Sequence, residues 1–172
     1  MMIRPYRGIL PTIAKDVFIA ETAVVIGDVV IGAESNIWFG TIVRGDVHAI
    51  RIGARTNIQD GSIVHVTRHR FGCTIGSGVT IGHAAVIHAC TLEDNCFIGM
   101  SATIMDGARV ESGAMVAAGA LVTSGKVVKS GELWAGSPAR FLRRLTDEEL
   151  AFFPESAANY VALAREYRES SA

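Results

Sequence analysis

Residues 13–43 read IAKDVF-IAETAV-VIGDVV-IGAESN-IWFGTI-V, and this stretch decides the fold. Every six-residue segment in it begins with Ile or Val, so an apolar β-branched side chain returns at a fixed interval. A period of six fits neither the 3.6-residue turn of an α-helix nor the two-residue alternation of an ordinary strand. It is typical of a parallel β-helix, in which each repeat supplies one short strand and one corner.

The same spacing continues beyond residue 43 in blocks separated by short breaks. Its later positions are Ile52, Ile58, Val64, Ile75, Ile81, Ile87, Ile98, Ile104, Val110, Val116, Val122 and Val128. Three repeats make one coil of about 18 residues, so about seven coils fit between residues 12 and 136. We therefore predict one mainly β domain over residues 1–172, a parallel β-helix of hexapeptide repeats with a continuous Ile and Val core. Its similarity to other hexapeptide-repeat proteins implies a left-handed coil.

A C-terminal α-helix is predicted over residues 146–170. Thr146 and Glu149 have the spacing of a capping box, which marks a helix start. Pro154 is expected to divide the segment into a short piece and a longer helix over about 155–170, because proline removes a backbone donor. Five side chains at helical spacing predict one face packed on the coils or on a neighbouring subunit. They are Ala157, Tyr160, Val161, Ala164 and Tyr167.

The composition argues against several classes of protein. A net charge of -1 gives no basic surface for nucleic acid or for an anionic membrane. The sequence contains no run of about 18 apolar residues, and its first residues lack the apolar centre of a signal peptide. Cys73, Cys90 and Cys96 form no C-x-x-C pair, so we expect buried thiols in a reducing compartment. These features predict a cytoplasmic protein that binds neither nucleic acid nor membrane.

The six-residue spacing breaks three times, over residues 43–52, 64–75 and 87–98. None of these intervals is a multiple of six, so a bulge or a loop is expected at each. The window that holds the breaks also holds all the histidines, which are His48, His65, His69, His83 and His88. Functional sites are where regular sequence patterns tend to fail, and this coincidence makes the window the candidate site.

Three of the histidines have an arrangement that suits a metal. His65 and His83 are one nominal coil apart, which predicts that they lie one strand spacing apart along the axis. His88 comes five residues after His83, which places it on the adjacent outer face across a corner. Three neutral imidazoles with an open fourth position make a catalytic zinc site, and a trimer could bring two such faces together. The alternative is three unrelated surface or core histidines.

Polar residues surround this set. Arg44 and Asp46 are expected to form an ion pair, with Gly45 allowing close approach. Gln59 and Asp60 flank the periodic Ile58 shortly before His65, where an acceptor for a metal ligand or its water would be needed. The alternative for Asp60 and Gln59 is ordinary hydrogen bonding at a corner.

These residues resemble the γ-class carbonic anhydrase family, in its bacterial branch. The matching strings are Arg44-Gly45-Asp46, Asn57-Ile58-Gln59-Asp60-Gly61, His65, and His83 through His88. Hexapeptide repeats alone are shared with many acyltransferases, whereas this ordered set is specific. The resemblance covers nearly the whole chain. It implies a homotrimer that hydrates CO2 reversibly to bicarbonate at zinc sites between subunits, where Fe²⁺ or Co²⁺ would also fit.

The resemblance also implies the ligands. His65 and His88 would bind the metal from one subunit and His83 from the next. Tyr160 would reach toward the site from the C-terminal helix.

Other residues receive supporting roles from the same resemblance. Gln59 and Asp60 would contact the water at the metal. Arg44 and Asp46 would support the interface and the pocket for the anion.

The chain departs from the best-characterised members at the proton exit. Those members carry acidic residues directly after Arg-Gly-Asp and in the loop after the first ligand, whereas this chain has Val47 and the basic loop 66–72. His69 in that loop would carry protons if it faces the site, and the alternative is a solvated loop histidine. Two alternatives to the anhydrase function remain. One is a metal-binding trimer with little anhydrase activity, and the other is a hexapeptide acyltransferase that uses CoA thioesters.

Overall fold

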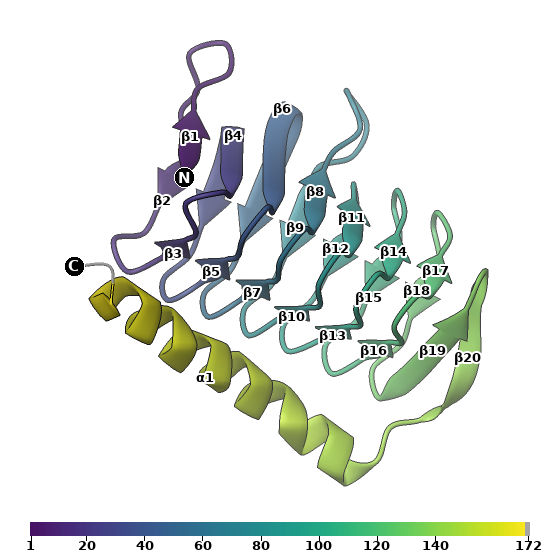
Figure 1. The fold of residues 1–172 in the computed structure, drawn as a ribbon. Helices are drawn as coiled ribbons and strands as arrows, with labels where there is room; N and C mark the ends of the chain where they lie inside the picture. The colour runs from purple at the N-terminus through teal and green to yellow at the C-terminus, as the bar shows by residue number, and fades with distance from the viewer. Residues whose placement is uncertain (171–172) are drawn as a thin grey trace.

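The structure is a computed structural model that describes residues 1–170 of the chain. It is a parallel β-helix of about seven turns with one long α-helix along its side (Figure 1). The expectation of a mainly β hexapeptide solenoid with a C-terminal helix is confirmed.

The short strands lie in three rows that run along the axis. The first row, called the histidine face, is β1 (Met2–Arg4), the first halves of β4 (Val24–Ile31) and β6 (Ile42–Ile52), β8 (Ile63–His65), β11 (Val86–His88), β14 (Thr103–Ile104) and β17 (Leu121–Val122). The second row is β2 (Thr12–Ile13), the second halves of β4 and β6, β9 (Cys73–Ile75), β12 (Thr91–Leu92), β15 (Arg109–Val110) and β18 (Val127–Val128).

The third row lies under the helix and is called the helix face. It is β3 (Phe18–Ile19), β5 (Asn36–Ile37), β7 (Asn57–Ile58), β10 (Thr80–Ile81), β13 (Phe97–Ile98), β16 (Met115–Val116) and β19 (Glu132–Gly136). The strand β20 (Ala139–Arg144) then turns back and pairs antiparallel with β19. All other named strand pairs among residues 1–170 are parallel, as a solenoid of this kind requires.

The periodic Ile and Val side chains form the core. From Val25 to Val128 they are buried, and those of one coil stack on those of the next, as Ile58 does on Ile81. The two earliest members, Ile13 and Ile19, are only partly buried because the first coil has a neighbour on one side. Cys73, Cys90 and Cys96 are buried and unpaired, which confirms their interpretation as apolar core thiols.

The three breaks in spacing have three different structures. The first lies within β6, one continuous strand that passes from the first row to the second and has an irregular register against β4. The second is the loop 66–72, which an antiparallel bridge between Thr67 and Phe71 closes. At the third, Leu92 enters the core five residues after Ile87, so the corner is one residue shorter than usual. The expectation of a bulge or a loop at every break is therefore wrong for the third.

One helix, α1 (Asp147–Ser170), comes after the coils and contacts β3, β5, β7 and β10 (Figure 1). The predicted capping box is confirmed, because the Thr146 amide donates to Glu149 Oε2 at 2.9 Å and the Glu149 amide donates to Thr146 Oγ1 at 3.2 Å. The predicted division at Pro154 is wrong, since α1 continues through it. Phe153, on one side of the proline, and Ala157, on the other, are both buried against the helix face, and this packing outweighs the loss of one backbone hydrogen bond. Within residues 1–170, α1 falls short of the length of apolar sequence that a helix needs to cross a bilayer.

Candidate metal centre

Two histidines meet on the histidine face. His65 ends β8 and His88 ends β11, and the two residues are direct partners in the parallel register. Each comes directly after a core residue, Val64 or Ile87, so strand alternation turns the imidazole outward. His65 Nδ1 lies 3.2 Å from His88 Nε2.

This register corrects the expectation that His65 and His83 are neighbours one coil apart. The loop 66–72 adds residues to the coil that separates β8 from β11, so the partner of His65 is 23 residues further on. The nominal coil length holds only where the spacing is unbroken.

A carboxylate holds the far nitrogen of each imidazole. His65 Nε2 lies 3.0 Å from Asp46 Oδ1, and His88 Nδ1 lies 2.6 Å from Asp106 Oδ1. If these two nitrogens carry the protons, as a carboxylate acceptor favours, then the nitrogens that face each other both present lone pairs. Burial lowers the pKa of His65 even though its hydrogen bond to Asp46 opposes the shift, so this imidazole is neutral near pH 7. Two lone pairs at this distance repel unless a cation lies between them.

The carboxylates themselves are held in the ionised state. Burial alone would raise the pKa of Asp46, but hydrogen bonds from His65 and Arg44 outweigh it and lower the pKa. Burial of Asp106 is outweighed in the same way by hydrogen bonds from Thr67 and His88, and its pKa is also lowered. Both side chains can therefore accept a proton-bearing nitrogen at neutral pH.

The predicted ion pair between Arg44 and Asp46 is confirmed. The reason for the glycine between them is different from the one expected. A Cβ on Gly45 would lie 2.5 Å from the backbone oxygen of Asp28, so the neighbouring coil, rather than the ion pair, requires glycine there.

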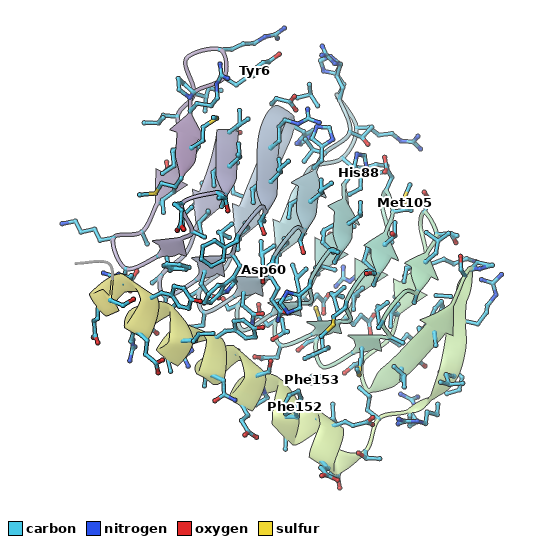
Figure 2. All side chains as sticks on the ribbon, in the orientation of Figure 1. Tyr6, Asp60, His88, Met105, Phe152 and Phe153 are labelled. Carbon is cyan, nitrogen blue, oxygen red and sulfur yellow. The ribbon has the colours of Figure 1, made fainter. Side chains whose placement is uncertain are left out.

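His83 lies apart from the other two histidines. It occupies the corner before β11, and its Nδ1 is 2.8 Å from Asp60 Oδ2, with both side chains well exposed. Figure 2 shows His88 beside Met105 on the histidine face and Asp60 nearer to α1. Within residues 1–170 no three or more His, Cys, Asp or Glu side chains converge on one point, so the chain by itself does not gather the three expected ligands.

The remaining expected site residues lie near the corner of His83. Gln59 is buried under α1 and donates from Nε2 to Asn57 Oδ1 at 2.9 Å. Tyr160 projects from α1 onto Trp38, with ring centroids 5.6 Å apart. Burial raises the pKa of Tyr160, and the charge of Asp60 adds to the shift, which places the phenol near that carboxylate.

The residue that sequence reasoning missed is Asp106. It comes two residues after Ile104 in β14, and a signal for it was available. Asp106 lies 18 residues after His88, with no break in the spacing other than the short corner. The register pairs Ile87 with Ile104, so Met105 is the counterpart of His88 in the next coil, and an acidic residue directly after it is a candidate partner.

The donor set fits a metal such as zinc. Two nitrogen ligands at about 2.0–2.1 Å from a tetrahedral ion lie about 3.3 Å apart, close to the spacing of His65 Nδ1 and His88 Nε2. A carboxylate on the second nitrogen of a ligating histidine is the usual arrangement around bound metals. Each of the three candidate histidines has such a partner, in Asp46, Asp60 or Asp106.

The loop 66–72 contains no carboxylate, as the sequence indicated. His69 lies exposed in it with a left-handed backbone (φ 59°). Its role as a proton carrier stays a prediction.

Known proteins similar to this chain are named either as hexapeptide transferases or as carbonic anhydrases. A model of the bacterial transferase hexapeptide (six repeats) matches residues 89–124. Gamma carbonic anhydrase 1, mitochondrial, of Arabidopsis thaliana is 52% identical over 94% of this chain and 61% of its own length. The carbonic anhydrase of Geobacillus kaustophilus is 42% identical over 97% of this chain and 91% of its own length.

Solved structures confirm the architecture. A hexapeptide transferase family protein from Anaplasma phagocytophilum superposes with a TM-score of 0.93 at 51% identity, over 96% of this chain and 98% of that one. The chain spans only about three fifths of the length of two Arabidopsis relatives, 61% and 58%.

Proposed function

The chain belongs to the γ-carbonic anhydrase family, and from this premise we propose that it hydrates CO2 reversibly to bicarbonate at metal sites shared between the subunits of a homotrimer. The observation that carries the proposal is the pair of imidazole nitrogens 3.2 Å apart, each backed by a carboxylate. With the far nitrogens held by carboxylates, the two facing nitrogens offer a metal two donor atoms at a suitable spacing.

The proposed ligands are His65 and His88 of one subunit and His83 of the next. Zn²⁺ is the first choice for three neutral nitrogens, and Fe²⁺ or Co²⁺ would be accepted by the same donors. When bound, such an ion lowers the pKa of water from 15.7 to about 7, which supplies the nucleophile for CO2.

The trimer is supported by an apolar row next to the histidines. Outward side chains two residues before His65 and His88 form a continuous ladder along the histidine face, in which Ile42 pairs with Ile63 and Ile63 with Val86. Ile42 is 37% exposed and Ile63 is 41% exposed in the single chain. A contiguous exposed apolar row marks an interaction surface, and closed symmetry lets the same row be covered in every copy.

The contacts of the single chain suggest roles for the proposed site residues. Asp60 would orient His83, because its carboxylate already holds Nδ1 and leaves Nε2 free. Asp46 would orient His65 in the same way, and Arg44 would neutralise Asp46 while its remaining N–H groups bind the bicarbonate anion. Gln59 and Tyr160 would supply polar groups beside His83, where a subunit corner meets the neighbouring face.

Proton transfer to solvent is expected to limit turnover. Val47 lies directly after Asp46 on β6, and the loop after His65 offers His69 rather than a carboxylate. The proposed rate is therefore below that of a family member with acidic residues at these places.

The direct test is stopped-flow CO2 hydration with protein loaded with Zn²⁺ or Fe²⁺, together with analysis of metal content. We expect one metal per subunit and a rate above that of buffer, both lost in His83→Ala. A rate equal to buffer with either metal would overturn the anhydrase proposal and favour a metal-binding trimer without turnover.

A mixing experiment tests whether the site is shared. His83→Ala and His88→Ala homotrimers should each be inactive. When the two variants are dissociated and reassembled together, about a quarter of the interfaces would combine an intact His83 with an intact His65 and His88 pair. Activity that does not return on mixing would contradict a site built from two subunits.

A second candidate is acyl transfer, which the name of the related Anaplasma protein favours. It predicts turnover of acetyl-CoA that survives removal of metal by a chelator and is lost in a histidine variant. Turnover of CO2 that requires metal would exclude it as the main activity.

The proposed compartment is the cytoplasm. Three buried thiols without a disulfide, Cys73, Cys90 and Cys96, support a reducing environment.

A further inference from the structure

Asp106 makes two hydrogen bonds that fix its position. His88 Nδ1 lies 2.6 Å from Oδ1, and the Thr67 hydroxyl donates to Oδ2. With both oxygens engaged by different segments, the carboxylate has little freedom to rotate. The three residues come from three successive coils, since Thr67 lies just beyond β8, His88 ends β11 and Asp106 lies just beyond β14.

The loop that carries Thr67 is itself held against the corner that carries Asp106. A bridge between Thr67 and Phe71 closes the loop. The ring of Phe71 then packs over Gly107, at 3.4 Å from the place that a Cβ on Gly107 would occupy. The inserted loop 66–72 therefore contacts the corner at 106–107 through both its hydroxyl and its aromatic ring.

The solenoid does not require a carboxylate at position 106. The corresponding residue, two after a core Ile or Val, is Met100, Ser112, Ala118 or Ser124 in the neighbouring repeats. All of these coils form the same corner without an acidic side chain. Asp94 holds the same place after Leu92, but its carboxylate accepts from the Ser77 amide, whereas the carboxylate of Asp106 faces the imidazole of His88.

We propose that Asp106 is a positioning residue for the metal, which fixes His88 with Nε2 turned toward His65, and that Thr67 holds Asp106 in place. The loop 66–72 then acts on the metal through this chain of contacts rather than by touching the metal. This inference rests on the proposed metal site and adds two residues to it. Partners of metal-ligating histidines usually govern affinity by about 10–100-fold.

The experiment measures metal affinity, not activity. The trimeric protein is stripped with a chelator, and the affinities of Zn²⁺ and Co²⁺ are determined by competition with a chromophoric chelator. Asp106→Asn should bind each ion about 10–100-fold more weakly than the unmodified protein. Thr67→Val, which removes the hydroxyl but keeps the shape, should weaken binding by a smaller factor in the same direction.

Two variants control for the substitutions themselves. Asp94→Asn makes the same change at a corner where the carboxylate accepts from the Ser77 amide at 2.7 Å, away from the histidines. Thr74→Val makes the same change on the second row of strands. Both should leave metal affinity unchanged.

A spectroscopic readout separates positioning from a general effect on stability. The visible absorption of bound Co²⁺ reports ligand geometry, so it should change in Asp106→Asn and return toward the original in Asp106→Glu. Unchanged affinity and spectrum in both Asp106→Asn and Thr67→Val would overturn the inference. If Asp106→Asn does not assemble, Thr67→Val decides the question by the same criteria. A parent protein that binds no metal would instead overturn the proposed function.

Discussion

The coils over residues 98–128 and the interrupted coils over residues 43–98 share one core but have different corners. In both regions the periodic Ile and Val side chains point inward and are buried. In the regular coils the left-handed corner position recurs at every sixth residue, and after Ser101 it is always glycine, at Gly107, Gly113, Gly119 and Gly125. In the interrupted coils several of these positions are Arg55, Ala84, Ala89 or Asn95.

Two of these residues lie next to candidate ligands. Ala84 comes directly after His83, and Ala89 directly after His88, and both have positive φ. A left-handed non-glycine residue costs about 1–2 kcal/mol, and such strain gathers at functional sites. The corners from Gly107 to Gly125 form without it. The buried Ile and Val residues therefore determine the architecture, while the breaks in spacing determine where the candidate functional side chains lie on the surface.

The largest expected effect tests the shared core. Ile104→Ala in the regular coils and Ile87→Ala in the interrupted coils each remove a fully buried side chain. Each should cost about 2–5 kcal/mol of unfolding free energy, measured by denaturant unfolding at one protein concentration. Val127→Ala, on the exposed outside of β18, should stay within about 0.5 kcal/mol. A much smaller loss for Ile87→Ala than for Ile104→Ala would break the comparison.

The next effect tests the regular corner. Gly119 has φ of +68°, and a Cβ there would meet nothing within 4 Å. Gly119→Ala should therefore lose about 1 kcal/mol through backbone strain alone, read from the shift in the denaturation midpoint. No loss would mean that glycine is not needed for conformation in the regular coils.

A smaller effect of opposite sign is expected at the interrupted corner. Ala84 has φ of 58° and is exposed, so Ala84→Gly removes strain without removing buried surface. The relief is partly offset by the greater freedom of glycine in the unfolded chain, and the net gain should be at most about 1 kcal/mol. A loss of stability in this variant would contradict the prediction and show that Ala84 carries no backbone strain that glycine relieves.

The smallest effect is the pH dependence of the interrupted coils. The lowered pKa of His65 means that the unfolded chain takes up a proton below pH 6.5 that the folded chain does not, so stability falls as the pH drops below 6.5. The lowered pKa of Asp46 gives a contribution that is complete above 3.8 and is lost below it as the folded carboxyl is protonated. The melting temperature of metal-free protein should fall in both windows. In His65→Gln the decrease in melting temperature below pH 6.5 should be smaller. A melting temperature that rises on acidification would contradict the lowered pKa of His65.

Most of the fold was predictable because one period repeats through the chain. The strands, the core and the helix cap at Thr146 all result from local pattern. The continuity of α1 through Pro154 could not be predicted from local pattern. It depends on burial of Phe153 and Ala157 against a surface that the local sequence does not reveal. Tertiary packing there overrides the local preference.

The candidate site was predictable in its residue types but not in its register. The sequence places the histidines in one window, and the confirmed pair of Arg44 and Asp46 could be named from spacing. The strand partner of His65 could not be named from the sequence. That residues 66–72 leave the regular coil follows only from the pairing of β8 with β11. Asp106 is a different case, because its place beside His88 depends on the pairing of β11 with β14, which the nearly regular spacing from residue 87 to residue 104 indicates.

The reversal of β20 against β19 has a consequence for self-association. A solenoid that ends on a parallel coil presents a template on which another molecule can continue the stack into a filament. Here the final strand runs backward, and it carries Arg140, Arg143 and Arg144 at its exposed surface. Two molecules that approached with this same end would bring these arginines together, which disfavours edge-to-edge pairing of their C-terminal strands.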